Sequence, residues 1–317
     1  MAYASDATHR VFVGIDVSKA QLDVGFWPAG ERWRFANDRA GRATLVRRLA
    51  RLRPAGIGLE ASGGYERDAL EALLDADLAA HRLNPLRVRQ FAMACGTMAK
   101  NDRLDAEAIA RFVGCVPHRA TVRPDPAAQA LAELVTARRQ LCDDLTRCTN
   151  HAEHVTQPVV RRCHQRRASR LKADILLLDK TIAQTVARDP AMARRNALLR
   201  SVPGVGPVFA HTLLALMPEL GTLSNRQAAA LIGVAPFDCE SGAHKGRRRI
   251  MGGRKPIRDV AYMAAMVAGN HNPVMAAFKT RLIQAGKLPK VAIVAVIRKL
   301  ITTLNAILRT GQPWHLA

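Results

Sequence analysis

The sequence predicts an α/β N-terminal domain over residues 1–122, a helical arm over 123–196 and a mainly helical C-terminal domain over 197–317. Short apolar segments alternate with helical patterns in the first region, which is typical of an α/β sheet protein. The second region is rich in Leu, Ala and Arg and has few turn signals, which favours long helices. The third is helical in pattern except for a Gly- and Arg-rich loop over residues 239–255.

The predicted elements of the first region follow from local patterns. Residues 10–36 hold three short apolar or alternating segments, and a Pro-Ala-Gly turn at 28–30 separates the last two, so three antiparallel strands are expected. Strands and helices then succeed one another. The predicted strands are 10–16, 22–27, 32–35, 57–60 and 82–85, and the predicted helices are 43–52, 65–77 and 102–113.

Two prolines within residues 122–126 mark the expected end of the first domain. Residues 127–195 are then expected to form the arm as a pair of long helices, with imperfect coiled-coil heptads. From Leu198 the helical pattern continues to the end of the chain, interrupted by the loop at 239–255.

The charge balance predicts a polyanionic partner. The chain has 48 Lys and Arg against 26 Asp and Glu, a formal net charge of +22. Such a field attracts nucleic acid in a salt-dependent way, whereas binding to a membrane surface normally needs an additional anchor. A compositional bias toward Arg would raise the charge without concentrating it. The basic residues are concentrated, in runs over residues 161–172 and 244–258.

Targeting signals and cysteine pattern favour a protein of the bacterial cytoplasm. The first residues are small and polar, and no apolar run approaches the roughly 18 residues of a membrane span. The six cysteines form no CxxC pair, which fits reduced thiols. A metal site made of Cys148, His151, His154, Cys163 and His164 is an alternative, but the spacing matches no common zinc pattern. A solvated helical face is the preferred interpretation.

Four acidic residues are the candidate catalytic and metal-binding group. Asp16 and Glu60 end two predicted strands, where α/β sheets place functional groups, and Asp102 and Asp105 share one face of a predicted helix. Carboxylates drawn together repel unless divalent cations lie between them, and hard oxygen ligands suit Mg²⁺ or Mn²⁺. Each acid alone is equally a surface charge or a cap. The order of strand-acid, strand-acid and helical DxxD is that of ribonuclease H.

The segment SVPGVGP at residues 201–207 lies between two predicted helices. It predicts a helix-hairpin-helix, in which the backbone around Gly204 and Gly206 offers N–H groups to a phosphate. A plain turn between helices remains the alternative.

The segments GIDVSKAQLDV, GLEASGGYE and KNDRLDAEAIARF resemble those of the DEDD-type insertion-sequence transposases, the family numbered one hundred and ten among insertion sequences. The resemblance implies a ribonuclease-H-like domain similar to Holliday-junction resolvases, with Asp16, Glu60, Asp102 and Asp105 at the DEDD positions. It also implies a guide, or bridge, RNA that selects the target, so that the protein reads backbone shape.

The segment GVAPFDCESGAHKGRRRIMGGRKPIRDVAYMAA is similar to the C-terminal part of the same family. The resemblance implies that Ser241 attacks DNA and forms a phosphoserine link. It further implies donor and target DNA as partners, and a homo-oligomer in which dimers pair into a tetramer, with no membrane partner. The expected nucleic-acid contacts are Lys100, Arg161, Arg162, Arg166, Arg167, Gly204, Gly206, Lys245, Arg247, Arg248, Arg249, Arg254 and Lys255.

Two other functions are compatible with the sequence. A metal-dependent nuclease or resolvase would use the four acids and water, leaving Ser241 incidental. A non-catalytic nucleic-acid-binding protein would have lost its active site, although all four acids are present. Tyrosine nucleophiles are less favoured, because Tyr65 is expected to pack beside Glu60 and Tyr262 to lie on an apolar stripe with Met266.

Overall fold

A computed structural model of the chain describes residues 10–96, 102–117, 121, 123, 125–237, 240–241, 244–245 and 248–315. For residues 102–104, 240–241 and 244–245 it describes the backbone only. The chain divides into two compact units, Met1–Arg123 and Pro124–Ala317. Each unit has a hydrophobic core of its own.

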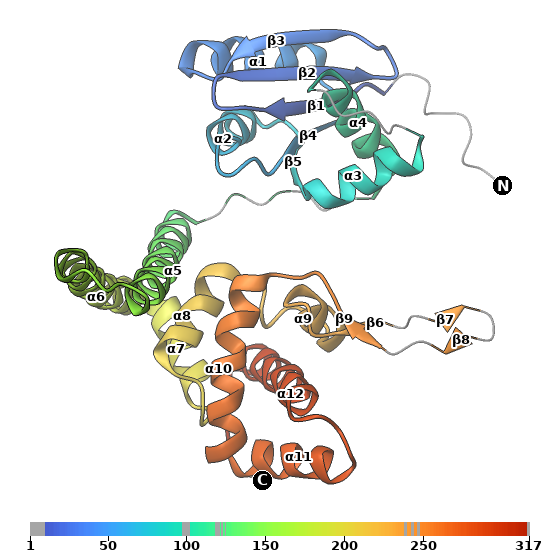
Figure 1. The fold of residues 1–317 in the computed structure, drawn as a ribbon. Helices are drawn as coiled ribbons and strands as arrows, with labels where there is room; N and C mark the ends of the chain where they lie inside the picture. The colour runs from blue at the N-terminus through green and yellow to red at the C-terminus, as the bar shows by residue number, and fades with distance from the viewer. Residues whose placement is uncertain are drawn as a thin grey trace. The chain divides into compact units, whose positions relative to one another are not determined.

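The first unit is built on a mixed five-stranded sheet with the order β3-β2-β1-β4-β5 (Figure 1). The first three strands are antiparallel neighbours, as the sequence predicts. β4 pairs in parallel with β1, and β5 pairs in parallel with β4, because a helix joins each successive pair from β3 onward. The strands are β1 (Phe12–Val17), β2 (Gln21–Trp27), β3 (Arg32–Ala36), β4 (Gly56–Glu60) and β5 (Ala80–Leu83).

Helices cover both faces of this sheet. Buried Val13 and Ile15 of β1 belong to a core shared with Leu45 of α1 and Leu73 of α2. The opposite face of the sheet packs against α4, which is flanked by α3. The helices are α1 (Arg39–Leu52), α2 (Arg67–Asp75), α3 (Pro85–Ala94) and α4 (Asp102–Cys115).

Glycines bring α4 unusually close to the sheet. A β-carbon at Gly14 of β1 would overlap the carbonyl oxygen of Ala106, and one at Gly25 of β2 would lie 2.8 Å from the backbone nitrogen of Glu107. A β-carbon at Gly58 of β4 would meet the side chain of Val113. The backbone of α4 therefore rests directly on β1 and β2, and its side chains pack closely on β4.

The second unit begins with the predicted helical arm. α5 (Pro126–Glu153) and α6 (Pro158–Arg188) pack along each other, and Arg138 bridges to Asp179 through two hydrogen bonds of 2.5 and 3.1 Å. At the base of the arm, buried Leu131 and Ile182 belong to the same core as the C-terminal helices. The residues predicted as arm and as C-terminal domain thus lie in one compact unit.

The rest of the second unit is a helical cluster with one protruding hairpin (Figure 1). In place of the predicted loop at 239–255, the chain forms two short antiparallel ladders, β6 with β9 and β7 with β8. The elements are α7 (Pro190–Arg200), α8 (Pro207–Leu216), α9 (Asn225–Leu231), β6 (Pro236–Phe237), β7 (Glu240–Ser241), β8 (His244–Lys245), β9 (Arg249–Ile250), α10 (Lys255–His271), α11 (Pro273–Gln284) and α12 (Pro289–Thr310).

α12 corrects the expectation that no apolar segment reaches the length of a membrane span. Its 22 residues have a mean hydropathy of 1.9 over their most apolar stretch, enough by composition to cross a bilayer. In this structure one stripe of the helix, including Val296, Leu300 and Leu304, is buried in the core of the second unit. Arg298 and Lys299 lie in the middle of the helix, as suits the core helix of a compact unit.

α3 is the helix of the first unit that the sequence prediction missed. The strand predicted at 82–85 ends at Leu83, and Pro85 begins the helix instead. Asn84 caps it, since its side chain accepts a hydrogen bond from the backbone N–H of Leu86. An Asn-Pro pair predicts the start of a helix. Asn is a favourable N-cap residue, and Pro suits the first helical position because the backbone N–H there would have no helical partner.

We expect Gly14→Ala to destabilise the first unit by about 3 kcal/mol, because the added methyl group overlaps the backbone of α4. Thermal or urea unfolding of the full chain measures this change. Gly206→Ala is the control, since a β-carbon there meets nothing within 4 Å and the backbone is not left-handed. Equal stability of Gly14→Ala and the wild type would contradict the close packing of α4.

Candidate functional site

Asp16 and Glu60 are adjacent at the carboxyl ends of two parallel strands. Ile15 of β1 is paired with Leu59 of β4, and the two acids are the next residues of those strands. Side chains alternate between the two faces of a strand. Asp16 is two residues after Gly14, and Glu60 is two residues after Gly58, so both acids lie on the face of the sheet that packs against α4. The predicted placement of these two acids at neighbouring strand ends is thus present in the structure.

α4 runs so that its first turn lies at the same corner of the sheet. Residues near its end approach the beginning of the strands, as Val113 does at Gly56. Ala106, nearer its start, contacts Gly14, two residues before Asp16. Asp102 lies one helical turn before Ala106, and Asp105 lies one turn before Ile109. Both positions are therefore on the stripe of α4 that faces the sheet. The topology therefore brings the four predicted acids to one corner of the first unit, although the side chain of Asp102 lies outside the described residues.

The described side chains alone do not form a metal-binding group. Among them no three or more His, Cys, Asp or Glu residues are arranged to hold a metal ion. The donors at this corner are nevertheless carboxylate oxygens, the ligand type that Mg²⁺ and Mn²⁺ prefer. The residues fit such an ion in chemistry, with Asp16, Glu60 and Asp105 as described donors.

Asp23 is an acid at this site that the sequence analysis did not single out. It lies directly across from Asp16 in the β1–β2 ladder, and hence on the same face. Its carboxylate accepts a 2.7 Å hydrogen bond from Arg34 of β3, which offsets its negative charge. The sequence signal was available, because Asp23 sits in an alternating strand next to the first candidate strand.

Glu66 is a second missed acid, and it organises the loop that follows Glu60. Its side chain is fully buried. Oε2 accepts hydrogen bonds from the backbone N–H groups of Ser62 and Gly64, at 3.0 and 2.9 Å, and Oε1 lies 2.9 Å from Arg82 Nη2. Burial alone would raise the pKa of Glu66, but these backbone donors, its own N–H and Arg82 outweigh burial and lower it.

Asn37 connects the two loops that follow the acidic strands. Its side-chain amide donates to the carbonyl oxygen of Ser18, two residues after Asp16, at 2.9 Å. The same amide group donates to the carbonyl oxygen of Tyr65 at 3.2 Å. Arg42 in turn donates to the carbonyl and the side-chain oxygen of Asn37. The ring of Tyr65 is half exposed.

Ser241 lies in the second unit, on the β7 strand of the hairpin, paired with His244 of β8. The hairpin is anchored at its base by glycines and one arginine. A β-carbon at Gly253 would overlap the backbone of Gly233, and Arg258 donates to the carbonyl oxygens of Ile232 and Gly252 at 3.2 and 2.6 Å. Arg258 therefore has a structural role. The side chain of Ser241 is outside the described residues.

The turn over residues 201–206 joins α7 and α8 as the helix-hairpin-helix prediction requires. Gly204 has φ +99°, and a β-carbon there would overlap Ala268 of α10, so this glycine serves packing. Gly206 caps α8 and faces open space, leaving the first N–H groups of that helix without helical partners. Of the two glycines, Gly206 is the better placed to approach a phosphate.

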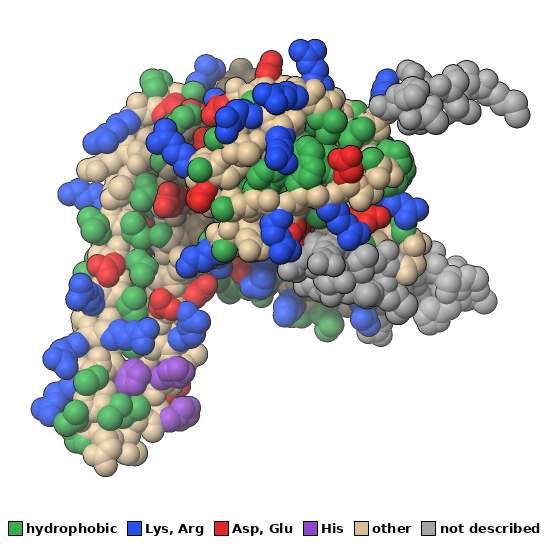
Figure 2. Space-filling model, turned by 90° about the horizontal axis from the view of Figure 1, so that it is seen from above, with side chains coloured by type: hydrophobic (Ala, Val, Ile, Leu, Met, Phe, Trp, Pro, Cys, Tyr) green, Lys and Arg blue, Asp and Glu red, His purple; other side chains and the backbone are tan. Residues whose placement is uncertain are grey.

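Six of the predicted basic contacts form two groups that differ in whether they are paired. Arg161, Arg162, Arg166 and Arg167 are exposed on α6, and none of them forms an ion pair within the described part of the chain. Figure 2 shows Lys and Arg side chains along this arm. Arg254, by contrast, pairs with Glu219 at 2.5 Å and donates to the carbonyl oxygen of Leu216, and Lys255 pairs with Asp259.

The remaining predicted contacts lie in or beside the hairpin, or before α4. Arg248 and Arg249 are exposed. Lys100 and Arg247 lie outside the described residues. For Lys245, the structure describes the backbone only.

Histidine side chains gather near the tip of the arm (Figure 2), and the buried Cys148 lies close to one of them. Cys148 Sγ lies 3.6 Å from Nδ1 of His164, and the rings of His151 and His164 are 6.4 Å apart between centroids. No metal-binding group of three such residues exists among the described side chains. The alternative of a zinc site is thus without support.

Both units match family models. Residues 13–158 match a model described as a transposase of the DEDD type named for IS110, and residues 196–280 match the model described as Transposase IS116/IS110/IS902 family. The pilin gene-inverting protein of Moraxella bovis is 26% identical over 324 residues, which cover 96% of this chain and 98% of that protein. The pilin gene-inverting protein of Moraxella lacunata has the same identity and coverage.

We expect Glu66→Gln to cost about 2 kcal/mol of stability at neutral pH, the scale of hydrogen bonds to a buried charged group. Because the pKa of Glu66 is lowered on folding, its carboxylate stabilises the fold above its ordinary pKa of 4.5, and that stability is lost as pH falls through the folded pKa. The difference from wild type should therefore shrink in acid. Urea unfolding between pH 7 and pH 3 measures it.

Asp68→Asn is the matched control for this variant. Asp68 lies in the first turn of the helix that begins directly after Glu66, but it is mostly exposed and pairs with Arg42 at the surface, so its loss should cost below about 1 kcal/mol. A Glu66→Gln deficit that stays constant down to pH 3 would show that the charge of Glu66 contributes nothing.

Proposed function

Because the chain belongs to the IS116/IS110/IS902 family of transposases, we propose that it cuts and rejoins DNA strands at the ends of a mobile element and at its target. The assembly of Asp16, Glu60 and the first turn of α4 at one corner of the sheet is the structural observation that carries the proposal. The order and pairing of the strands are compatible with a ribonuclease-H-like domain. The relatives named for inverting a pilin gene support DNA recombination as the reaction class.

The acidic corner would hold Mg²⁺ or Mn²⁺ through Asp16, Glu60, Asp102 and Asp105. When bound, such an ion polarises a phosphodiester and neutralises charge on its oxygens. The chain itself supplies the positions of the donors. Glu66 and Asn37 hold the loops after β4 and β1, so the two strand-end carboxylates keep a fixed spacing. Arg34 offsets the negative charge of Asp23, which would otherwise add repulsion beside Asp16.

Ser241 is the proposed nucleophile. Its Oγ attacks the phosphorus of a DNA phosphodiester, a Ser–O–P bond forms, the P–O bond to one strand end breaks, and the leaving oxygen takes a proton. A carboxylate of the acidic corner accepts the proton of the Ser241 hydroxyl. Attack by a strand-end hydroxyl on the phosphoserine reverses these steps, so the bond energy is conserved and a new strand junction forms.

Ser241 and the acids lie in different units, so the proposal requires them to meet within one chain or across protomers. The family resemblance favours protomers of a dimer that assembles into a tetramer. A bridge RNA would pair with donor and target DNA and select them. The exposed arginines of α6 would then contact sugar-phosphate backbones without reading sequence.

The location of the acids together in one unit, without Ser241, also supports a second candidate function. A metal-dependent nuclease or resolvase would need only the acidic corner of the first unit, with water as the nucleophile. The two mechanisms differ in one product, because only the serine mechanism joins protein covalently to DNA.

We expect Ser241→Ala, Asp16→Asn and Asp102→Asn to reduce recombination between donor and target plasmids by at least about a thousandfold, the scale on which catalytic groups act. Cells would carry the element with its flanking non-coding DNA. Denaturing gels of wild-type reactions should contain a protein–DNA adduct that Ser241→Ala lacks.

Two variants control for general damage. Glu107→Gln changes an acid of α4 that pairs with Arg32 at the surface, and Ser169→Ala removes a hydroxyl from the exposed face of α6. Both should recombine normally. Normal recombination by Ser241→Ala would exclude the serine mechanism and favour the nuclease.

The exposed arginines of α6 should determine the salt dependence of nucleic-acid binding. Replacing Arg162 and Arg166 together by Ala should reduce the slope of log K against log salt by about 2, because each phosphate contact contributes roughly 0.9. Fluorescence anisotropy with labelled duplex DNA from 50 to 300 mM salt measures the slope. Arg188→Ala, on the same helix outside the basic run, should leave it unchanged.

A further inference from the structure

The second unit contains a cavity that the proposed reaction does not use. It has a volume of about 470 Å³ and lies where the arm helices α5 and α6 meet α8 and α10. Its wall is largely apolar and includes the buried residues Val135, Ile182 and Phe209. At its edge, Met263 and Val267 of α10 are 60% and 47% exposed. The volume falls in the range of small-molecule sites, roughly 300–1,000 Å³.

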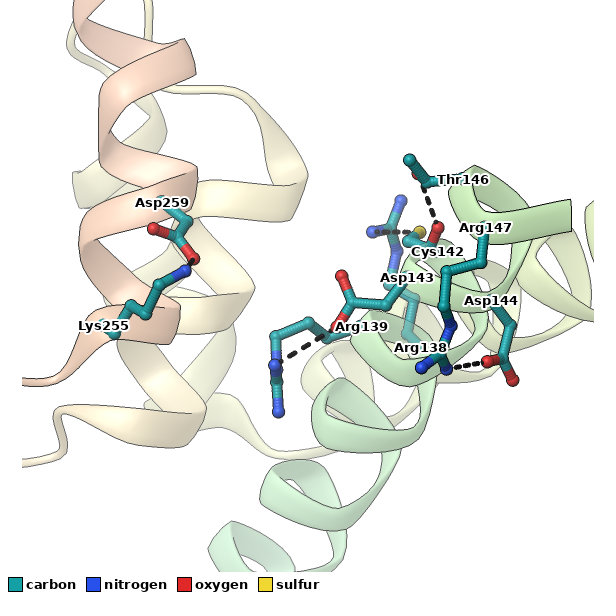
Figure 3. A network of polar contacts seen from close by, with 9 residues as sticks. All are labelled: Arg138, Arg139, Cys142, Asp143, Asp144, Thr146, Arg147, Lys255 and Asp259. Carbon is teal, nitrogen blue, oxygen red and sulfur yellow. Dashed lines mark hydrogen bonds and ion pairs between the residues drawn. The ribbon is translucent and has the colours of Figure 1, made fainter. Parts of the chain in front are cut away.

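The charged groups that line the cavity balance one another. Figure 3 shows Arg139 paired with Asp143 on α5, and Lys255 paired with Asp259 on α10. The remaining pair is Arg138 with Asp179, which joins α5 to α6. With each cation matched by a carboxylate, the interior does not select an anion. A neutral ligand with an apolar face and a polar edge fits it better.

His211 of α8 supplies a hydrogen-bonding group inside the cavity. The residue is 8% exposed, and no hydrogen bond to its ring exists among the described residues. Burial, with the nearby positive charge of Arg200 and Arg138, lowers the pKa of His211, although Asp179 opposes this. A neutral imidazole offers one donor and one acceptor. At the wall of the cavity, this group can pair with the polar edge of a ligand.

The opening of the cavity suits the sugar-phosphate part of a strand. α8 and α10 both begin there, at Gly206 and Lys255, so the positive ends of two helix dipoles point to its edge. Lys255 is 73% exposed in its side chain, and Arg139 is 44% exposed, so both cations lie at the surface beside the opening.

From this combination we propose that the cavity takes one unpaired nucleobase of a bound nucleic-acid strand. The base lies against Phe209 and the apolar wall, its polar edge pairs with His211, and the flanking phosphates stay at the opening. The inference rests on the proposed nucleic-acid function and adds a place where the protein holds a base outside a duplex. Proteins that hold extruded or unpaired bases use apolar and aromatic walls in this way.

The test compares two labelled DNA duplexes of equal length, one fully paired and one with a single unpaired thymine. The full chain should bind the second about tenfold more tightly by anisotropy, the scale of one base stacked in a site. Permanganate oxidises exposed unpaired thymine. The wild-type protein should protect that thymine at saturation.

Two methionines of α10 provide a matched pair of variants. Met263 lines the cavity, whereas Met266 is exposed on the same helix and does not line it. Met263→Trp should fill the opening and abolish both the tenfold preference and the protection, while Met266→Trp should keep both. His211→Gln, which retains a donor and an acceptor, should bind the unpaired thymine better than His211→Leu.

The outcomes separate this inference from the function on which it rests. Equal binding of both duplexes with a reactive thymine overturns the base site and leaves nucleic-acid binding intact. Absence of binding to either duplex overturns both. If Met263→Trp leaves thymine protection unchanged but alters the oligomeric mass, the cavity is a protein contact and the base site is wrong.

Discussion

The acidic corner depends on how closely α4 approaches the sheet. Gly14, Gly25 and Gly58 present bare backbone to the helix, and side chains at these positions would push it outward. The two strand-end acids extend from the strands, whereas Asp102 and Asp105 come from the helix. Carboxylates that share a cation must be positioned to within a fraction of an ångström, so a shift of the helix would separate the two halves of the group. The glycines therefore set the geometry that the acids require.

The loops that surround this corner are held by hydrogen bonds instead of packing. Glu66 accepts from backbone N–H groups of the loop after Glu60, and Asn37 joins that loop to the one after Asp16. The hairpin of the second unit is fixed by a similar combination. Close glycines at its base and the guanidinium of Arg258 hold the two chain segments together. In both units, a charged side chain that bonds to backbone groups fixes the loop next to a candidate catalytic residue; Glu66 is buried and Arg258 is partly buried.

Much of the first unit could be predicted from its sequence because its signals are local. Alternation in 22–27 and an apolar run ending at Asp16 are visible without the structure, and so is the helical DxxD. The residues that were missed act at long range. Glu66 resembles any surface acid at the start of a helix until the fold buries it against Arg82. Arg258 likewise resembles part of a basic run until Gly252 and Ile232 are brought beside it.

The net charge of +22 overstates how many basic residues are available to nucleic acid. Arg138 and Arg254 each hold a carboxylate of the same unit, and Arg258 holds backbone carbonyls, so their charges serve the fold. Arg162 and Arg167 on α6 are exposed and have no carboxylate among the described residues. Charge that is already paired releases few counterions when DNA binds, because the partner must first be displaced. The exposed arginines of α6 therefore offer electrostatic attraction to a phosphate backbone, whereas Arg254, Lys255 and Arg258 of the 244–258 run are already engaged within the unit.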